Sequence, residues 1–155
     1  MKKILLLGIV GLFSTMSIAQ NTSQIKRTPL PLAVYGDNLD APLTQKERGF
    51  ILEVYGDYAQ KYVFDNPQRL KAIKQILRNR VKVQQALDEK MKKPCPKLSE
   101  VELNMAFNAA LKRDEFFNPS TFNPLKYNFK FYSQGAAMYK VDNSNYYIII
   151  NSQYQ

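Results

Sequence analysis

The stretch from Phe116 to Ile150 constrains the fold most, because its pattern indicates a β-sheet more clearly than any other part of the chain. Aromatic and β-branched residues recur there in short runs, with turn-forming residues between them at 134–135 and 142–145. The runs are 127–131, 138–141 and 146–150. This spacing is typical of strands joined by short hairpin connections. We therefore predict a three-stranded antiparallel β-meander at the C-terminal end of the chain.

The last of these runs, 146–150, is apolar on both of its faces. Its residues are Tyr146, Tyr147, Ile148, Ile149 and Ile150. Successive side chains of a strand point to opposite faces of the sheet, so both faces of this strand are expected to be covered. The sequence predicts a central strand with helices packed over at least one face of the sheet, in an α+β fold.

A capping box marks the start of the first predicted helix, because Thr44 is followed three residues later by Glu47. Apolar residues then recur at helical spacing as far as Tyr62. The sequence Asp-Asn-Pro at 65–67 predicts a break and a new helix start. This second helix is predicted to continue from Gln68 to about Lys90.

Two further segments complete the predicted architecture. The alternation at 80–83 leaves a short strand as an alternative to the end of the second helix. Ser99 and Glu102 have the spacing of another capping box, so a short third helix is predicted as far as Leu111. We thus expect two or three helices packed on a small sheet.

Residues 1–19 have the composition of a secretory signal peptide. Lys2 and Lys3 precede an apolar run at 4–13, and small residues follow as far as Ala19. The run is much shorter than the roughly 20 residues that a transmembrane helix needs. We predict cleavage between Ala19 and Gln20, with the remaining chain periplasmic or secreted and without a transmembrane segment.

The rest of the chain is predicted to contain one extended segment and one domain. Residues 20–43 are polar and interrupted by prolines, so we expect an N-terminal arm or linker. Residues 44–155 are predicted to form a single domain, whose stability has to come from its core because Cys95 is the only cysteine. Neighbouring lysines favour the thiolate form of Cys95.

The absence of histidine removes several classes of chemistry from consideration. Ser-His-Asp and Cys-His catalysis require histidine, and the common zinc sites require histidine or several cysteines. We therefore predict no catalytic residue, no metal ligand and no cofactor. A small hydrolase that uses paired carboxylates is the alternative, since such an enzyme needs only two placed acids. The candidate acids are Glu53, Asp57, Asp114 and Glu115.

Positive charge is concentrated between residues 69 and 97, where ten Lys or Arg residues accompany two acidic ones. Helical spacing would align four of them in one stripe: Lys71, Lys74, Arg78 and Lys82. Such a stripe can contact an anionic envelope lipid or polysaccharide, whereas a solvated helix face is the alternative interpretation. Nucleic acid is disfavoured as a partner, because an exported protein is separated from the nucleic acids of the cell. In addition, no aromatic residues alternate with the basic residues of the stripe.

Two tyrosines form a second candidate binding feature. Tyr132 and Tyr147 lie on the faces opposite the main apolar stripes of their predicted strands, where they would form an aromatic platform for a sugar or a peptide. The unpaired edge of a small sheet is also a possible contact for a protein partner. Together these features predict a non-catalytic binding or envelope-associated component.

Overall fold

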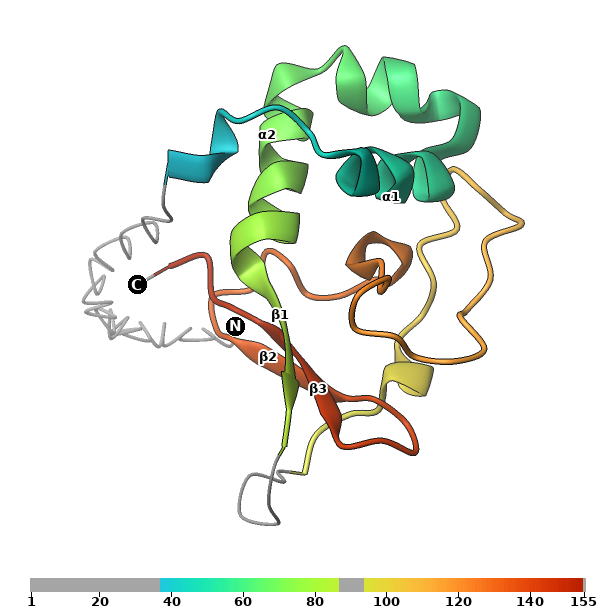
Figure 1. Cartoon of the computed structure of the whole chain (residues 1–155), viewed down its shortest axis with the longest axis vertical. Helices are drawn as coiled ribbons and strands as arrows, with labels where there is room; N and C mark the ends of the chain where they lie inside the picture. Colours follow the sequence, from blue (N-terminus) through green and yellow to red (C-terminus); the bar gives the residue numbers. More distant parts are fainter. Residues whose placement is uncertain (1–36, 87–93, 155) are drawn as a thin grey trace, which may run out of the picture.

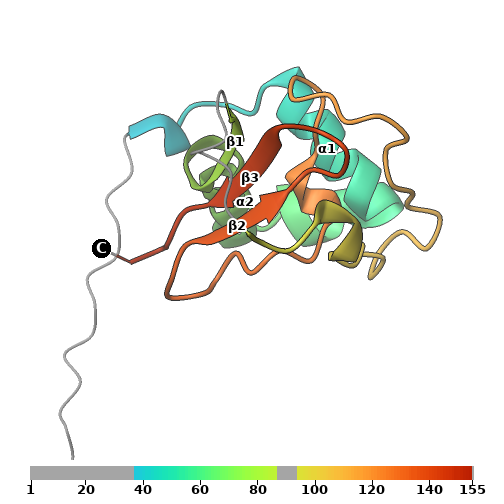
Figure 2. The ribbon, with the colours of Figure 1, turned by 90° about the horizontal axis from the view of Figure 1, so that it is seen from below.

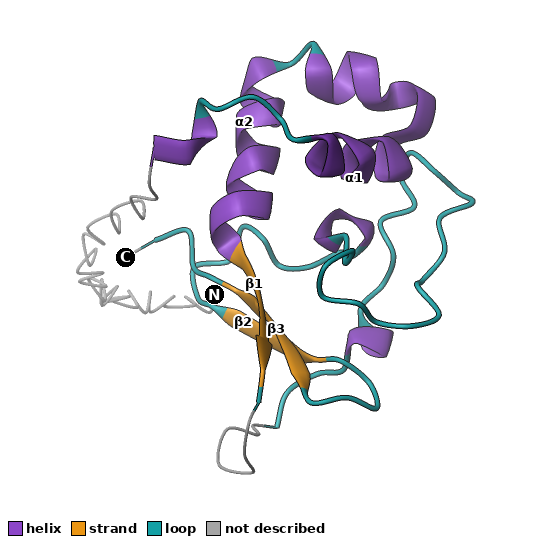
Figure 3. Ribbon diagram, in the orientation of Figure 1, coloured by secondary structure: helices purple, strands orange, loops and turns teal. Residues whose placement is uncertain are grey.

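The computed structural model describes residues 37–86 and 94–154. The predicted signal peptide and residues 20–36 of the predicted arm lie outside the described residues. A helical region and a small antiparallel sheet pack against each other, and helix α2 (Pro67–Gln75) leads through a π-helical turn into strand β1 (Val81–Gln85) (Figures 1 and 3). The predicted α+β fold class is confirmed.

Helix α1, Gln45–Tyr55, begins with the predicted capping box. The backbone N–H of Thr44 donates to Glu47 Oε2 at 2.8 Å, and the N–H of Glu47 donates to Thr44 Oγ1 at 3.2 Å. These two bonds satisfy donors that the first turn of a helix would otherwise leave unpaired. The buried face of α1 contains Ile51, Val54 and Tyr55.

The first helix ends earlier than predicted. Gly56 has φ 51° and ψ −132°, and it is followed by a short 3₁₀ turn and a π-helical turn, Gln60–Phe64. A positive φ cannot continue a right-handed helix, so the chain changes direction at this residue. Tyr58 and Tyr62, predicted on the apolar face of one continuous helix, are exposed instead.

Helix α2, Pro67–Gln75, starts where the sequence predicts, because the side chain of Asn66 accepts a hydrogen bond from the Arg69 N–H at 3.0 Å. A π-helical turn, Ile76–Arg80, follows it, and the chain then becomes strand β1, Val81–Gln85. The prediction of a helix extending toward Lys90 is therefore wrong. The alternation at 80–83 belongs to a strand, the alternative that the sequence left open.

The sheet of the described chain contains β1, β2 (Ala137–Lys140) and β3 (Tyr146–Ile150) in the order β1-β3-β2. Both pairings are antiparallel, and Ile148 of β3 lies opposite Val83 on one side and Tyr139 on the other. Figure 2 shows β3 between its two neighbours. The predicted central position of the last strand is confirmed.

Two predicted elements are absent from the described chain. Residues 127–131 do not form a strand, because β1 occupies that place beside β3. Their backbone instead forms tight turns, with the Phe129 N–H donating to the Tyr127 carbonyl at 2.8 Å. The predicted third helix is reduced to one 3₁₀ turn, Leu98–Glu100, and the chain up to Leu111 is irregular.

The core consists of two neighbouring clusters of buried side chains. The cluster on the sheet includes Ile148, Ile150, Phe122, Tyr127 and Phe129. The cluster between the helices includes Ile51, Val54, Val63, Ile73 and Leu125. Val81 and Phe131 pack against both clusters, so the irregular segment 127–131 connects the sheet to the helices through its rings.

Candidate functional site

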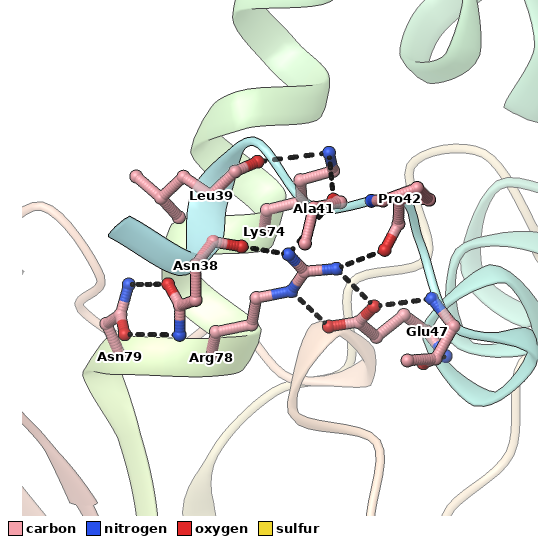
Figure 4. A network of polar contacts seen from close by, with 9 residues as sticks. Asn38, Leu39, Ala41, Pro42, Glu47, Lys74, Arg78 and Asn79 are labelled. Carbon is pink, nitrogen blue, oxygen red and sulfur yellow. Dashed lines mark hydrogen bonds and ion pairs between the residues drawn. The ribbon is translucent and has the colours of Figure 1, made fainter. Parts of the chain in front are cut away.

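Two of the predicted anion-binding cations hold the segment that precedes α1 (Figure 4). Lys74 Nζ donates to the carbonyl oxygens of Leu39 and Ala41, at 3.1 and 2.7 Å. Arg78 donates to the carbonyl oxygens of Asn38, Ala41 and Pro42. We call this arrangement the N-terminal clasp. It consists of Lys74, Arg78, the carbonyls that they bind and Glu47, which pairs with Arg78.

The clasp is strongly electrostatic. Arg78 Nε lies 2.6 Å from Glu47 Oε1, and Arg78 Nη2 lies 2.8 Å from Glu47 Oε2. The hydrogen bond from Arg78 outweighs the effect of burial and lowers the pKa of Glu47 from its ordinary value of 4.5 to about 2. The same bond raises the pKa of Arg78. Both groups are therefore charged across the whole physiological pH range.

The structure does not bring the four predicted cations together as one stripe. Lys82 lies on β1, because the helical region ends at Arg80. Lys74 is buried in the clasp, and Arg78 is committed to Glu47 and to backbone carbonyls. Lys71 and Lys82 are exposed. The predicted geometry of the stripe is thus wrong, while anion binding by its two exposed members stays a prediction.

The two predicted platform tyrosines lie in different environments. Tyr132 is 61% exposed, whereas Tyr147 is only 4% exposed. A buried ring cannot offer its face to a ligand, so these two residues do not form a shared platform. Tyr132 nevertheless lies at the cavity described below.

The acidic candidates converge on a buried lysine. Lys126 is 3% exposed, and its Nζ lies 2.6 Å from Asp114 Oδ1 and 3.0 Å from Glu53 Oε1. Asn123 Nδ2 donates to Glu53 Oε2 at 2.9 Å and so orients that carboxylate. Burial acts to lower the pKa of Lys126, but its bonds to Asp114 and Glu53 outweigh burial, and the pKa is raised. Lys126 therefore stays protonated and cannot act as a nucleophile.

This cluster, Lys126 with Glu53 and Asp114, is arranged as an ion-pair network. Asp57 is exposed and is not part of it. Asp114 and Glu115 do line a cavity of about 270 Å³ together with Asp142. Asp142 is held there by the N–H and hydroxyl of Ser99, at 2.9 and 2.6 Å, and these bonds lower its pKa against the opposing effect of burial. Paired-carboxylate hydrolysis stays the alternative prediction, with Asp114 and Glu115 at this cavity and Glu53 bound to Lys126.

Cys95 does not have the electrostatic environment that the sequence suggests. Burial raises the pKa of its thiol, and this effect exceeds the opposing influence of the Lys140 backbone N–H. The thiol form is therefore favoured over the thiolate, contrary to the prediction.

A second cavity, of about 200 Å³, lies between α2 and the irregular segment 127–132. Its buried lining residues are Tyr55, Ile73, Ile76, Leu125, Tyr127 and Phe129. More accessible residues complete it, namely Arg69, Asn104, Asn128, Phe131 and Tyr132. We call it the Arg69 cavity. Its buried lining residues are aromatic or aliphatic, whereas Arg69, Asn104 and Asn128 are more accessible.

Arg69 is the charged group of this cavity. Its Nη2 donates to the hydroxyl of Tyr55 at 2.9 Å, and its guanidinium lies 6.0 Å from the centre of the Tyr55 ring. The hydrogen bond to Tyr55 raises the pKa of Arg69 in spite of partial burial. No carboxylate pairs with Arg69 within residues 37–86 and 94–154. The cavity therefore has an exposed positive charge whose position is fixed by a buried tyrosine.

Sequence analysis missed this cavity, although one signal for it is present. Residues 69, 73 and 76 have the spacing that places side chains on one face of a helix, and all three line the cavity. The opposite wall comes from residues 127–132, of which 127–131 were predicted to form a regular strand. Without the turns of that segment, nothing in the sequence brings Tyr132 to Arg69.

Within the described residues, no group of His, Cys, Asp or Glu side chains has the arrangement of a metal site. None of the helices in this part of the chain has the length and apolarity needed to cross a membrane. A scan against protein-family models and searches of curated proteins and of solved structures found no match to this chain.

Proposed function

We propose that this chain is an exported, non-catalytic binding protein that contacts an anionic envelope partner through α2. One observation carries the proposal: Arg69 presents an exposed guanidinium, without a carboxylate partner in the described chain, at the rim of an aromatic cavity. Arginine is suited to an anionic partner at such a cavity, because its planar group matches carboxylate and phosphate oxygens and also packs on aromatic rings. The composition of residues 1–19 supports export.

The other cations near α2 support Arg69 as the centre of the contact. Lys74 and Arg78 are committed to the clasp, and Arg80 is buried with its guanidinium bound to the Asn151 carbonyl. Lys71 and Lys82 are exposed and add to the positive potential of this region. They do not line the Arg69 cavity, so their expected contribution is long-range attraction.

Sedimentation with lipid vesicles tests this proposal. We expect the protein to bind phosphatidylcholine vesicles only when they contain anionic phosphatidylglycerol, and less strongly as salt rises. Arg69→Gln should weaken binding by more than about tenfold, because it removes the roughly 1 kcal/mol that any basic residue contributes at an anionic surface and, in addition, the charge-assisted hydrogen bonds of the guanidinium.

Lys71→Gln is the matched control, since it removes one charge from the same helix but not from the cavity. Its effect should be clearly smaller than that of Arg69→Gln. Equal losses would show that the attraction is unspecific, and absence of binding to anionic vesicles would contradict a lipid partner.

A further inference from the structure

We propose that the Arg69 cavity binds a carboxylate attached to a ring-sized apolar group. The inference rests on the proposed binding function and adds the chemical class of the ligand. It follows from three properties of the cavity: its inner lining, its size and the charge at its rim.

The inner lining selects for an apolar group. Ile73, Ile76 and Leu125 are almost completely buried, and the rings of Tyr127 and Phe129 form the wall opposite α2. Binding of an aromatic ring here is favoured in two ways. The ring removes its apolar surface from water, and it makes offset or edge contacts with these rings.

The size of the cavity limits the ligand to one ring. Its volume of about 200 Å³ is below the roughly 300 to 1,000 Å³ of sites that enclose drug-sized molecules. The occupant is therefore a small molecule with a single ring, or one side chain of a larger partner.

The rim supplies one positive charge with directional donors. Tyr55 binds one nitrogen of the Arg69 guanidinium and so positions the group, which leaves its other N–H groups for a planar carboxylate. No second cation lines the cavity among the described residues. A phosphate monoester carries about −1.5 to −2 charge at neutral pH, so a carboxylate is the better match for a single arginine. The amides of Asn104 and Asn128 add neutral donors at the same rim.

Two sources can supply this chemistry. One is a free aromatic acid, and the other is the C-terminal residue of a peptide, where an apolar side chain and a carboxylate leave the same carbon. The ligand group that enters the cavity is equivalent in both cases, and the experiment separates them.

An NMR titration of the ¹⁵N-labelled protein with three small ligands tests the inference. Phenylacetate should shift the backbone amides of Asn128, Phe129 and Tyr132. Phenylacetamide has the same shape without the charge, and acetate has the charge without the ring. We expect each of them to bind at least about tenfold more weakly than phenylacetate. Phenylacetamide loses a charge-assisted hydrogen bond and acetate loses a buried ring, and either loss corresponds to about a tenfold change in affinity.

Two variants locate the effect. Arg69→Gln should weaken phenylacetate binding by about tenfold and leave the weak binding of phenylacetamide unchanged, whereas Lys71→Gln should change neither. Arg69 is exposed, so the Gln variant is expected to fold, and an unchanged amide spectrum outside the cavity checks this. Equal affinity for phenylacetate and phenylacetamide, or shifts that map elsewhere, would overturn the inference.

A tripeptide Gly-Gly-Phe with a free or an amidated C-terminus separates the two sources. Preferential binding of the free-acid peptide supports a peptide terminus, and binding of phenylacetate alone supports a free aromatic acid. The vesicle experiment distinguishes the two proposals. Vesicle binding that depends on Arg69, without any response to phenylacetate, would overturn the ligand class only. The opposite result would overturn the envelope partner only.

Discussion

Glu47 connects two helices through one carboxylate. Its oxygens accept hydrogen bonds from the Thr44 N–H at the start of α1 and from Arg78 in the turn that follows α2. The capping box was predicted because Glu47 follows Thr44 by three residues, whereas the partner 31 residues away was not predicted. The capping role can be read from a local pattern, because Thr44 and Glu47 lie in one helical turn. The ion pair with Arg78 depends on how the helices pack against each other.

The lowered pKa of Glu47 predicts a specific loss of stability in acid. A carboxylate whose pKa is lower in the folded chain stabilises the fold above its unfolded pKa, and the stabilisation disappears as pH falls. The expected window runs from about pH 4.5 down to about pH 2. We expect a contribution of about 2 kcal/mol, which allows for screening by the solvent that reaches the pair.

Urea unfolding of the wild type and of Glu47→Gln at several pH values measures this contribution. The difference in unfolding free energy should be largest above pH 4.5 and should shrink toward zero near pH 2. A difference that does not change with pH would contradict a contribution from the charged form of Glu47.

At the scale of elements, two glycines in the same region are expected to respond in opposite ways to alanine. Gly56 has a φ of 51°, which an L side chain rarely adopts, so Gly56→Ala should destabilise the protein by about 1–3 kcal/mol. Gly49 lies within α1 with no atom near an added Cβ, so Gly49→Ala should stabilise it by about 0.5–1 kcal/mol. Thermal unfolding of the two variants compares them directly.

The conformation of Gly56 explains why the end of the first helix was predicted wrongly. Apolar spacing continues past Gly56, and periodicity alone does not show whether a glycine adopts a helical or a left-handed conformation. If Gly56→Ala leaves stability unchanged, the bend does not need glycine, and the exposed positions of Tyr58 and Tyr62 require another cause.

The sheet shows a second limit of local patterns. Residues 127–131 alternate in the manner of a strand, but their aromatic side chains fill the space between sheet and helices while β1 supplies the backbone partner of β3. The alternation therefore correctly indicates burial of Tyr127 and Phe129 and partial burial of Phe131, at intervals of two. Strand pairing depends on which segment reaches β3, and that is decided by the position of α2.

At the scale of the molecule, Lys126 joins parts that are distant in the sequence. Its partners Glu53 and Asp114 come from α1 and from the irregular segment before the turn Pro124–Lys126. Lys126→Met should lower the unfolding free energy by about 1–3 kcal/mol, because both carboxylates lose a charged hydrogen bond. Their exposed fractions of 43% and 41% allow water to replace the lost contacts, which limits the cost.

Urea unfolding of this variant, with Lys112→Met as an exposed control, tests the expectation. Lys112 has the same charge but is exposed in the described chain. An unchanged or increased free energy for Lys126→Met would mean that desolvation of the lysine cancels its ion pairs.

The sequence was sufficient for the fold class, for the starts of α1 and α2 and for the central position of β3. These depend on caps and periodicities within a few residues. The Arg69 cavity, the clasp and the Lys126 network were not predictable, because each one combines side chains that lie far apart along the chain. The distribution of charged residues indicated a basic segment, but only packing determines which of its cations are exposed and which form bonds within the protein.

The N-terminal clasp has a consequence for tolerance to substitution. Lys74 and Arg78 bind mainly carbonyl oxygens of residues 38–42, which every amino acid provides. These hydrogen bonds therefore depend on the path of the main chain and not on most of the side chains along it. Residues 39–42 can therefore change their identity with little effect on docking, whereas Lys74 and Arg78 cannot be exchanged as freely. Asn38 is an exception in this segment, because its side chain also pairs with that of Asn79.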